Sequence, residues 1–228
     1  MNPPSTSKIS LSALKRHAPI LLALFVGLLL PLVIFGQIAN EVRDRDPMWF
    51  DDAILTQLHL HATPPRDAGI IFLTRLGAAR VIVPFSLLVL AAFWVKKRRG
   101  EALFFGVAAG GAMLLSPLAK VIFQRERPAL WLSPAPEFDF GFPSGHAMTS
   151  MGVVAALVVI FWPTPWRYLA LVLGTFFVVM IGFTRLYLGV HYPTDVLGGW
   201  CAALIWVSGV KAAMWGREVW TRRYSTGS

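Results

Sequence analysis

Long runs of hydrophobic residues, separated by short polar segments, are the dominant pattern along the chain. A helix needs about 20 mostly apolar residues to cross the hydrocarbon layer of a membrane. Six segments approach this length: 19–39, 76–95, 101–120, 146–162, 168–184 and 194–215. We therefore expect an all-α integral membrane protein, a bundle of six transmembrane helices that forms a single domain over residues 1–228.

The first two segments need separate arguments. Segment 19–39 follows basic residues, as a secretory signal does, but its apolar run is longer than the ~7–15 residues of such a signal, so we interpret it as a retained anchor. Segment 76–95 has arginines at 75 and 80, and its uninterrupted apolar part is short. We expect the helix to begin near Leu76, with Arg80 reaching the interface or pairing inside the bundle.

Positive charge falls on one side of the expected bundle. Cytoplasmic loops are enriched in Lys and Arg, so the basic positions predict that both termini are cytoplasmic. The connection 40–67 contains more acidic than basic residues and is expected on the outer side. The basic residues used for this orientation are Lys8, Lys15, Arg16, Lys96, Lys97, Arg98, Arg99, Arg217, Arg222 and Arg223.

Part of that outer connection has a helical pattern of its own. Phe50, Ile54 and Leu58 recur every four residues. This spacing is typical of a short amphipathic helix, and it predicts that residues 48–60 lie in the membrane interface. An ordinary loop is the alternative that the pattern leaves open.

Composition narrows the classes of function. Hydrophobic residues make up 56% of the chain and charged residues 14%, which indicates a membrane protein. The net charge of +9 lies in clusters beside apolar runs, so lipid headgroups are the expected partner and nucleic acid is not. Cys201 is the single cysteine and excludes an internal disulfide. His59 and His61 are two residues apart and would face different sides of a helix, which argues against a metal site there.

Unusual polar residues occur where the third and fifth segments end and the fourth and sixth begin. Six alternating spans bring these four ends to one membrane depth on the outer side. A single Lys or Arg at a helix end is most often an interfacial anchor, but several cations at one depth indicate an anion-binding site. The residues concerned are Lys120, Arg125, Arg127, Ser144, Gly145, His146, Arg185, His191 and Asp195.

Two histidines in this group indicate phosphoryl transfer. An imidazole is a competent nucleophile at neutral pH when a carboxylate holds its second ring nitrogen, and Asp195 follows His191 by four residues. His146 is then available to protonate the leaving oxygen and to activate water. Backbone amides of Gly145 and His146 at a helix start would add hydrogen bonds to a phosphate.

Three motifs in this region resemble a known family. They are Lys120 with Arg127-Pro128 after six residues, then Pro143-Ser144-Gly145-His146, then Arg185 with His191 and Asp195 at spacings of six and four. The chain resembles the type 2 phosphatidic-acid phosphatase superfamily, with its motif core over 120–195. Thr184 stands where serine is common in the family, and it keeps the hydroxyl group.

The resemblance implies roles for these residues and a class of substrate. Lys120, Arg127, Ser144, Gly145 and Arg185 would bind phosphate; His191 would form a phosphohistidine, His146 would act as the acid, and Asp195 would orient His191. No metal or other cofactor is implied. The substrate is expected to be a lipid phosphate, with undecaprenyl pyrophosphate preferred by analogy over phosphatidylglycerol phosphate, phosphatidic acid and lipid A phosphates. The loop 128–142 is expected to line the entrance or to form an interfacial aromatic belt.

Other classes of protein remain open at this point. A vanadate-dependent peroxidase has a similar anion site, but those relatives are soluble. A non-catalytic lipid-binding relative is expected to lose the nucleophile or its carboxylate, and both are present. A lipid-phosphate transporter would place its polar residues near the middle of the membrane.

Overall fold

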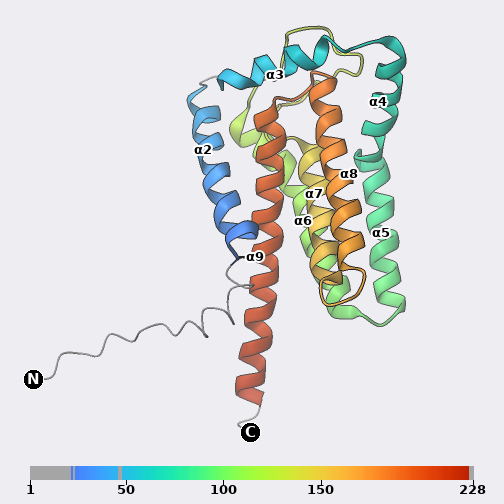
Figure 1. Cartoon of the computed structure of the whole chain (residues 1–228). Coiled ribbons are helices and arrows are strands. Elements are labelled where there is room, and N and C mark those ends of the chain that lie inside the picture. Colours follow the sequence, from blue (N-terminus) through green and yellow to red (C-terminus); the bar gives the residue numbers. More distant parts are fainter. Residues whose placement is uncertain (1–21, 23, 46–47, 226–228) are drawn as a thin grey trace, which may run out of the picture.

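A computed structural model describes residues 22, 24–45 and 48–225, and every regular element in these ranges is a helix. The long helices stand side by side, while α3 crosses one end of the bundle, far from the C-terminus (Figure 1). The helices are η1 (Phe25–Leu29), α2 (Leu30–Asp44), α3 (Trp49–His59), α4 (Pro64–Leu76), α5 (Ala79–Val95), α6 (Arg99–Phe123), α7 (Gly145–Phe161), α8 (Arg167–Tyr187) and α9 (Pro193–Ser225).

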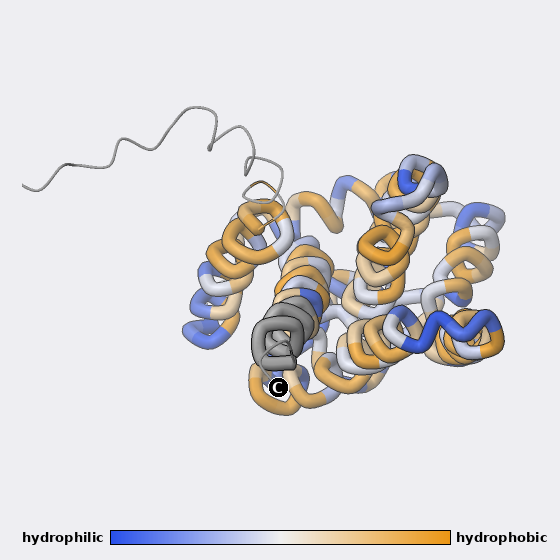
Figure 2. Tube along the Cα trace, turned by 90° about the horizontal axis from the view of Figure 1, so that it is seen from below, coloured by the Kyte–Doolittle hydropathy of each residue, from blue (hydrophilic) through white to orange (hydrophobic). Residues whose placement is uncertain are grey.

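Five helical stretches in the described residues are long and apolar enough to cross a membrane. The sixth apolar helix, α7, has 17 residues and is about 25 Å long. Hydrophobic residues predominate along the helices when the bundle is viewed end-on (Figure 2). The chain is therefore a multi-pass membrane protein. The five stretches are Phe25–Asp44, Pro64–Val95, Arg99–Phe123, Arg167–Tyr187 and Pro193–Met214.

The start of the first expected span cannot be compared with the structure. Residues 19–21 and 23 lie outside the described residues, as do the basic positions Lys8, Lys15 and Arg16. Within the described residues, the first span continues to Asp44, five residues beyond its expected end.

The second expected span differs from the structure at its beginning. An additional helix, α4, precedes α5, and a break at residues 77–78 separates the two. Arg75 and Arg80, on either side of the break, are both exposed. Gly77 is buried in the break, and a Cβ atom at this position would lie 2.7 Å from Ile181 and 3.3 Å from the ring of His146. The close approach at the break therefore depends on glycine.

Helix α7 lies at the centre of the bundle and packs against α6, α8 and α9. Small residues allow the close approach: a Cβ on Gly152 would meet Ala112 at 2.5 Å, and one on Gly199 would meet the Ser144 carbonyl at 2.8 Å. Membrane helices associate largely through such van der Waals contacts, because lipid tails are as apolar as the side chains. This packing fixes the start of α7 beside the start of α9.

Residues 49–59 form a helix, so the alternative of an ordinary loop is wrong. Its buried residues are Asp51 and Leu55, whereas Ile54 on the expected apolar face is 38% exposed. Phe50 and Leu58 of that face are half-buried, so α3 faces the bundle with both apolar side chains and the acidic side chain of Asp51.

Candidate active site

The ends of α6 and α8 and the starts of α7 and α9 meet beneath α3, and the irregular segment 124–144 crosses them (Figure 1). This arrangement brings the polar residues singled out in the sequence to one place. Helix ends supply Lys120, Ser144, Gly145, His146, Arg185 and Asp195, the α8–α9 connection supplies His191, and segment 124–144 supplies Arg127. A cavity of about 330 Å³ is lined by Lys120, Gly145 and His146 among others.

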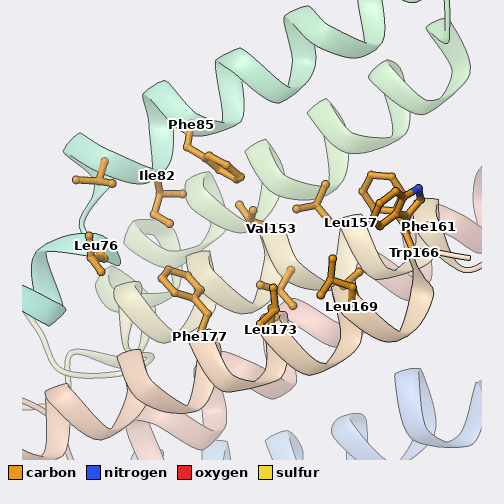
Figure 3. Close-up of a pocket in the computed structure, with 14 residues that line it drawn as sticks. Leu76, Ile82, Phe85, Val153, Leu157, Phe161, Trp166, Leu169, Leu173 and Phe177 are labelled. Carbon is orange, nitrogen blue, oxygen red and sulfur yellow. The ribbon is translucent and has the colours of Figure 1, made fainter.

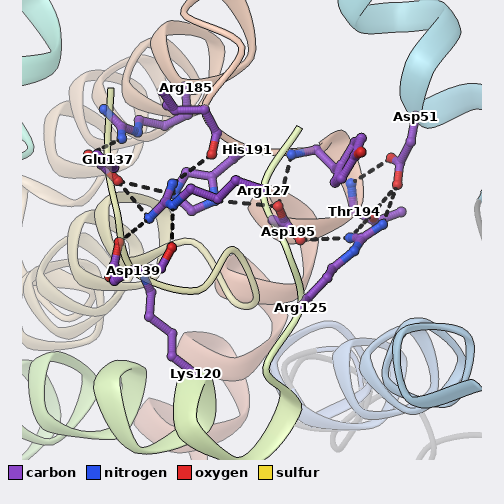
Figure 4. Close-up of polar contacts among 12 residues, drawn as sticks. Asp51, Lys120, Arg125, Arg127, Glu137, Asp139, Arg185, His191, Thr194 and Asp195 are labelled. Carbon is purple, nitrogen blue, oxygen red and sulfur yellow. Dashed lines mark hydrogen bonds and ion pairs between the residues drawn. The ribbon is translucent and has the colours of Figure 1, made fainter. Parts of the chain in front are cut away.

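His191 is 1% exposed and is held at both ring nitrogens (Figure 4). Its Nδ1 lies 3.4 Å from Asp195 Oδ2, which also accepts a hydrogen bond from the Tyr192 amide. Its Nε2 lies 3.0 Å from Arg127 Nη1. Burial, reinforced by Arg127 and Arg185, lowers the pKa of His191 well below its ordinary value. The ring is therefore neutral near pH 7, with Nε2 facing the cations.

Three cations lie near the Nε2 side of this ring. Arg185 is 2% exposed and donates from Nη1 to Thr74 Oγ1 at 2.8 Å. Arg127 donates from Nη1 to the Val190 carbonyl at 2.6 Å. Lys120, in the last turn of α6, is 9% exposed and lines the cavity. Fixed contacts to the protein thus orient both guanidinium groups toward one point.

Two buried polar atoms beside this point have no hydrogen-bond partner among the described residues. They are Oγ of Ser144 and Nε of Arg185. Buried donors are normally paired, so these two unpaired donors require an explanation. Oxygens of an anion bound at the start of α7 would accept hydrogen bonds from both. The donor set therefore fits a tetrahedral oxyanion.

Two acidic residues that the sequence analysis did not single out contact these cations. Glu137 forms ion pairs with Arg127 and Arg185, and Asp139 pairs with Lys120 and Arg127. Burial opposes ionisation of both carboxyls, but the Arg185 charge next to Glu137 and the Lys120 hydrogen bond to Asp139 outweigh it. Each pKa falls to about 2. Both residues belong to an irregular segment, where periodicity gives no signal.

Asp195 is supported from behind by a second set of residues. Arg125 Nη1 donates to Asp195 Oδ1 and to Thr194 Oγ1, each at 2.6 Å. Its Nη2 donates to Asp51 Oδ2 at 2.9 Å. Asp51 also accepts from the Thr194 amide at 3.1 Å, and so it caps the start of α9. The sequence places Arg125 in the candidate site, but it gives no signal that separates Asp51 from the other acidic residues of the outer connection.

The aromatic residues of the loop 128–142 do not form one surface. Phe142 is fully buried, Phe138 is 95% exposed, and Trp131 stacks on His59 with ring centroids 4.0 Å apart. Stacking against Trp131 therefore explains the position of the His59 ring.

Comparison with known proteins agrees with this geometry. Residues 101–218 match the family model described as the PAP2 superfamily, over more than half of the chain. The chain belongs to the PAP2 superfamily. This is the family that the three motifs indicated, and the matched region contains all three motifs.

Curated PAP2 relatives are phosphatases. The chain is 29% identical to phosphatidylglycerophosphatase B of Bacillus subtilis, over 68% of this chain and 78% of that protein. It is 26% identical to the undecaprenyl-diphosphatase of Sulfolobus acidocaldarius, over 85% of this chain and 89% of that protein. These relatives are hydrolases that act on phosphate groups.

Two solved structures have the same fold. The transmembrane PAP2-type phosphatidylglycerolphosphate phosphatase of Bacillus subtilis aligns with a TM-score of 0.71 and 25% identity, over 80% of this chain and 94% of that chain. LpxE of Aquifex aeolicus aligns with a TM-score of 0.59 and 19% identity, over 73% of this chain and 98% of that chain. The second likeness concerns the fold alone.

Proposed function

We propose that this chain hydrolyses the terminal phosphate or diphosphate group of a membrane lipid through a phosphohistidine at His191. The observation that carries this proposal is the neutral His191 ring, whose Nε2 faces three cations while Asp195 lies behind Nδ1. A neutral nitrogen can attack phosphorus, and the cations offset the charge that develops on the phosphoryl oxygens.

The reaction proceeds in two displacements. His191 Nε2 bonds to phosphorus as the bond from phosphorus to the leaving oxygen breaks, and His146 gives that oxygen a proton. His146 then takes a proton from water, which attacks the phosphohistidine and releases inorganic phosphate. Asp195 stabilises the charged imidazole between the two steps. Lys120, Arg127 and Arg185 hold the phosphoryl group throughout, helped by Ser144 and the Gly145 amide.

An apolar groove beside the cavity supports a lipid as the substrate. The groove has a volume of about 680 Å³ and runs along α7 between α5 and α8 (Figure 3). It begins at Leu76, next to Gly77, which lines the catalytic cavity. Its lining continues to Phe161 and Trp166, at the far ends of α7 and α8. A hydrocarbon chain fits this groove while the phosphate occupies the cavity.

Narrowing the groove is expected to affect only long-chain substrates. Ala170 lines the groove 15 residues before Arg185, roughly 22 Å along α8 from the site. We expect Ala170→Phe to raise the KM for a long-chain lipid phosphate about tenfold. The phenyl ring would expose a few methylene groups of the lipid chain, and the free energy of burying them corresponds to a change of that size. A dibutanoyl substrate should keep its KM.

Val172→Phe is the matched control, because Val172 is 64% exposed on the same helix and does not line the groove. Steady-state kinetics give the KM of each variant for the long-chain and for the dibutanoyl substrate. Equal effects of the two variants on the long-chain substrate would argue against tail binding in the groove.

We also propose how the helices are arranged in the membrane. We infer six spans, with α7 as the shortest, and α3 lying in the interface beside the site. The α5–α6 connection, which carries Lys96 to Arg99, lies at the end opposite α3 (Figure 1). Because basic loops are cytoplasmic, this supports cytoplasmic termini and a catalytic end on the outer face of a plasma membrane, periplasmic in a Gram-negative bacterium.

Undecaprenyl pyrophosphate is the substrate that we favour, supported by the relative named undecaprenyl-diphosphatase. Phosphatidylglycerophosphate, phosphatidic acid and lipid A phosphates are the alternatives. A panel of these lipids, assayed for phosphate release by the purified chain, tests the proposal. Binding of the lipids without phosphate release would instead indicate a lipid-phosphate receptor or transporter.

Phosphate release is expected to continue in the presence of a chelator. Among the residues that the structure describes, His, Cys, Asp and Glu side chains form no group of three that could hold a metal ion. The protein's own cations, instead of a metal ion, are placed to neutralise the charge of the phosphoryl group. We expect the rate in EDTA to stay within about twofold of the untreated rate, which is a negligible change in barrier. A strict requirement for added Mg²⁺ would contradict the mechanism.

A further inference from the structure

Two carboxylates occupy the space into which the phosphate-binding cations point (Figure 4). Glu137 contacts both arginines: Oε1 accepts from Arg185 Nη2, and Oε2 lies 2.8 Å from Arg127 Nη2. Asp139 bridges Lys120 and Arg127, at 2.5 Å from each. Each carboxylate therefore spans two cations, as the oxygens of a phosphate group would.

The two carboxylates also lie between the cations and solvent. The side chains of the three cations and of His191 are at most 11% exposed, whereas those of Glu137 and Asp139 are 28% and 60% exposed. Glu137 Oε2 is 3.8 Å from His191 Nε2, the atom placed to attack phosphorus. A phosphate group must displace Glu137 before it can contact both arginines and His191 Nε2.

Both carboxylates are charged at working pH, and neither belongs to a helix. The pKa of about 2 for each keeps them charged near pH 7. They belong to the irregular segment 124–144, so their displacement breaks no helix. An anion that displaces Glu137 must offer the cations more than the single charge already in place.

We propose that Glu137 and Asp139 compete with the substrate for its own site. This competition lowers the affinity of every phosphate group, so that only a terminal, doubly charged group still binds. This inference rests on the proposed phosphatase function. A phosphodiester carries one negative charge, so its exchange for the Glu137 carboxylate brings the three cations no further charge. A terminal phosphate carries about −1.5 to −2 near pH 7, so its exchange adds favourable interactions. Ordinary phospholipid headgroups are diesters, and this competition would keep them out of the site.

Binding of two small matched probes tests the inference directly. Methyl phosphate represents a terminal phosphate and dimethyl phosphate a diester. Their affinities are measured by calorimetry on the full chain in detergent, for wild type, Glu137→Gln and Asp139→Asn. Glu126→Gln is the control, because Glu126 is an exposed acid of the same segment.

We expect wild type to bind methyl phosphate and to bind dimethyl phosphate far more weakly. Glu137→Gln should bind both probes about tenfold more tightly, since it removes a competing charge-assisted contact to two arginines. Asp139→Asn should show a smaller gain, about threefold, because this carboxylate is more exposed and its ion pairs are screened. Glu126→Gln should match wild type.

Unchanged or weaker binding of methyl phosphate by Glu137→Gln would overturn the inference, because the carboxylate would then only hold the arginines in place. Should that variant fail to fold, Asp139→Asn decides, and an affinity equal to wild type would count against the proposal. The binding assay needs no turnover. A wild type that hydrolyses no lipid phosphate refutes the proposed function, while the affinities still decide whether the carboxylates compete.

Discussion

Replacement of His191 by alanine is expected to lower phosphate release by roughly 10⁴-fold or more, because no other group can form the covalent intermediate. His191 is 1% exposed and its Nε2 faces the cationic cluster. The binding cations remain in the variant, so lipid phosphate should still bind. The measurement is release of inorganic phosphate from a radiolabelled lipid, together with the phosphorylated protein trapped by a rapid quench.

The control for this variant is His61→Ala. His61 is an exposed histidine at the same end of the bundle, where it contacts the Gln57 carbonyl. It should leave both turnover and trapped phosphoprotein unchanged. His146→Ala, tested with a substrate whose leaving group needs no proton, should accumulate the phosphoprotein. Near-normal turnover by His191→Ala in a folded sample would refute the mechanism.

Replacement of Arg125 by glutamine is expected to lower kcat about 100-fold and stability by about 3 kcal/mol, as loss of one partner from a buried ion pair does. Arg125 forms ion pairs with Asp195 and Asp51, whose side chains are at most 3% exposed. It also donates a hydrogen bond to Thr194 Oγ1. Without it, Asp195 loses the contact that fixes its orientation toward His191. KM should change little, because Arg125 contacts Asp195 on the side away from the phosphate site.

Arg43→Gln is the control, because Arg43 is an exposed arginine at the end of α2. Turnover and thermal unfolding in detergent are measured for both variants. A large rise in KM with an unchanged kcat for Arg125→Gln would show that Arg125 binds substrate instead of positioning Asp195.

The sequence predicted the long helices and most of the candidate site because both leave local signals. Apolar runs identify the helices, and the ends of α6 to α9 are marked by the charged residues that interrupt those runs. Lys120, Arg185 and Asp195 belong to helix turns at such boundaries, so topology alone placed them together. Their roles in catalysis stay predictions.

Other features depend on contacts between distant residues and leave no such signal. Helix α4 contains two prolines, an arginine and an aspartate at its start, so its pattern resembles a polar loop. Asp51 is one of several acids near α3, and only the packing of α3 against α9 places it at Thr194, 143 residues away. Glu137 and Asp139 lie in a segment without periodicity, and their partners come from α6, from α8 and from the segment itself.

In the membrane arrangement that we propose, the 17 residues of α7 determine how deep the chemistry takes place. At about 25 Å, this helix is some 5 Å shorter than the ~30 Å hydrocarbon layer. Its first turn, with Gly145 and His146, is therefore not lifted above the headgroups. A lipid can present its phosphate at this level while its chains stay in hydrocarbon, so no apolar surface has to be transferred into water during turnover. Only the small, fully soluble phosphate ion has to leave the membrane.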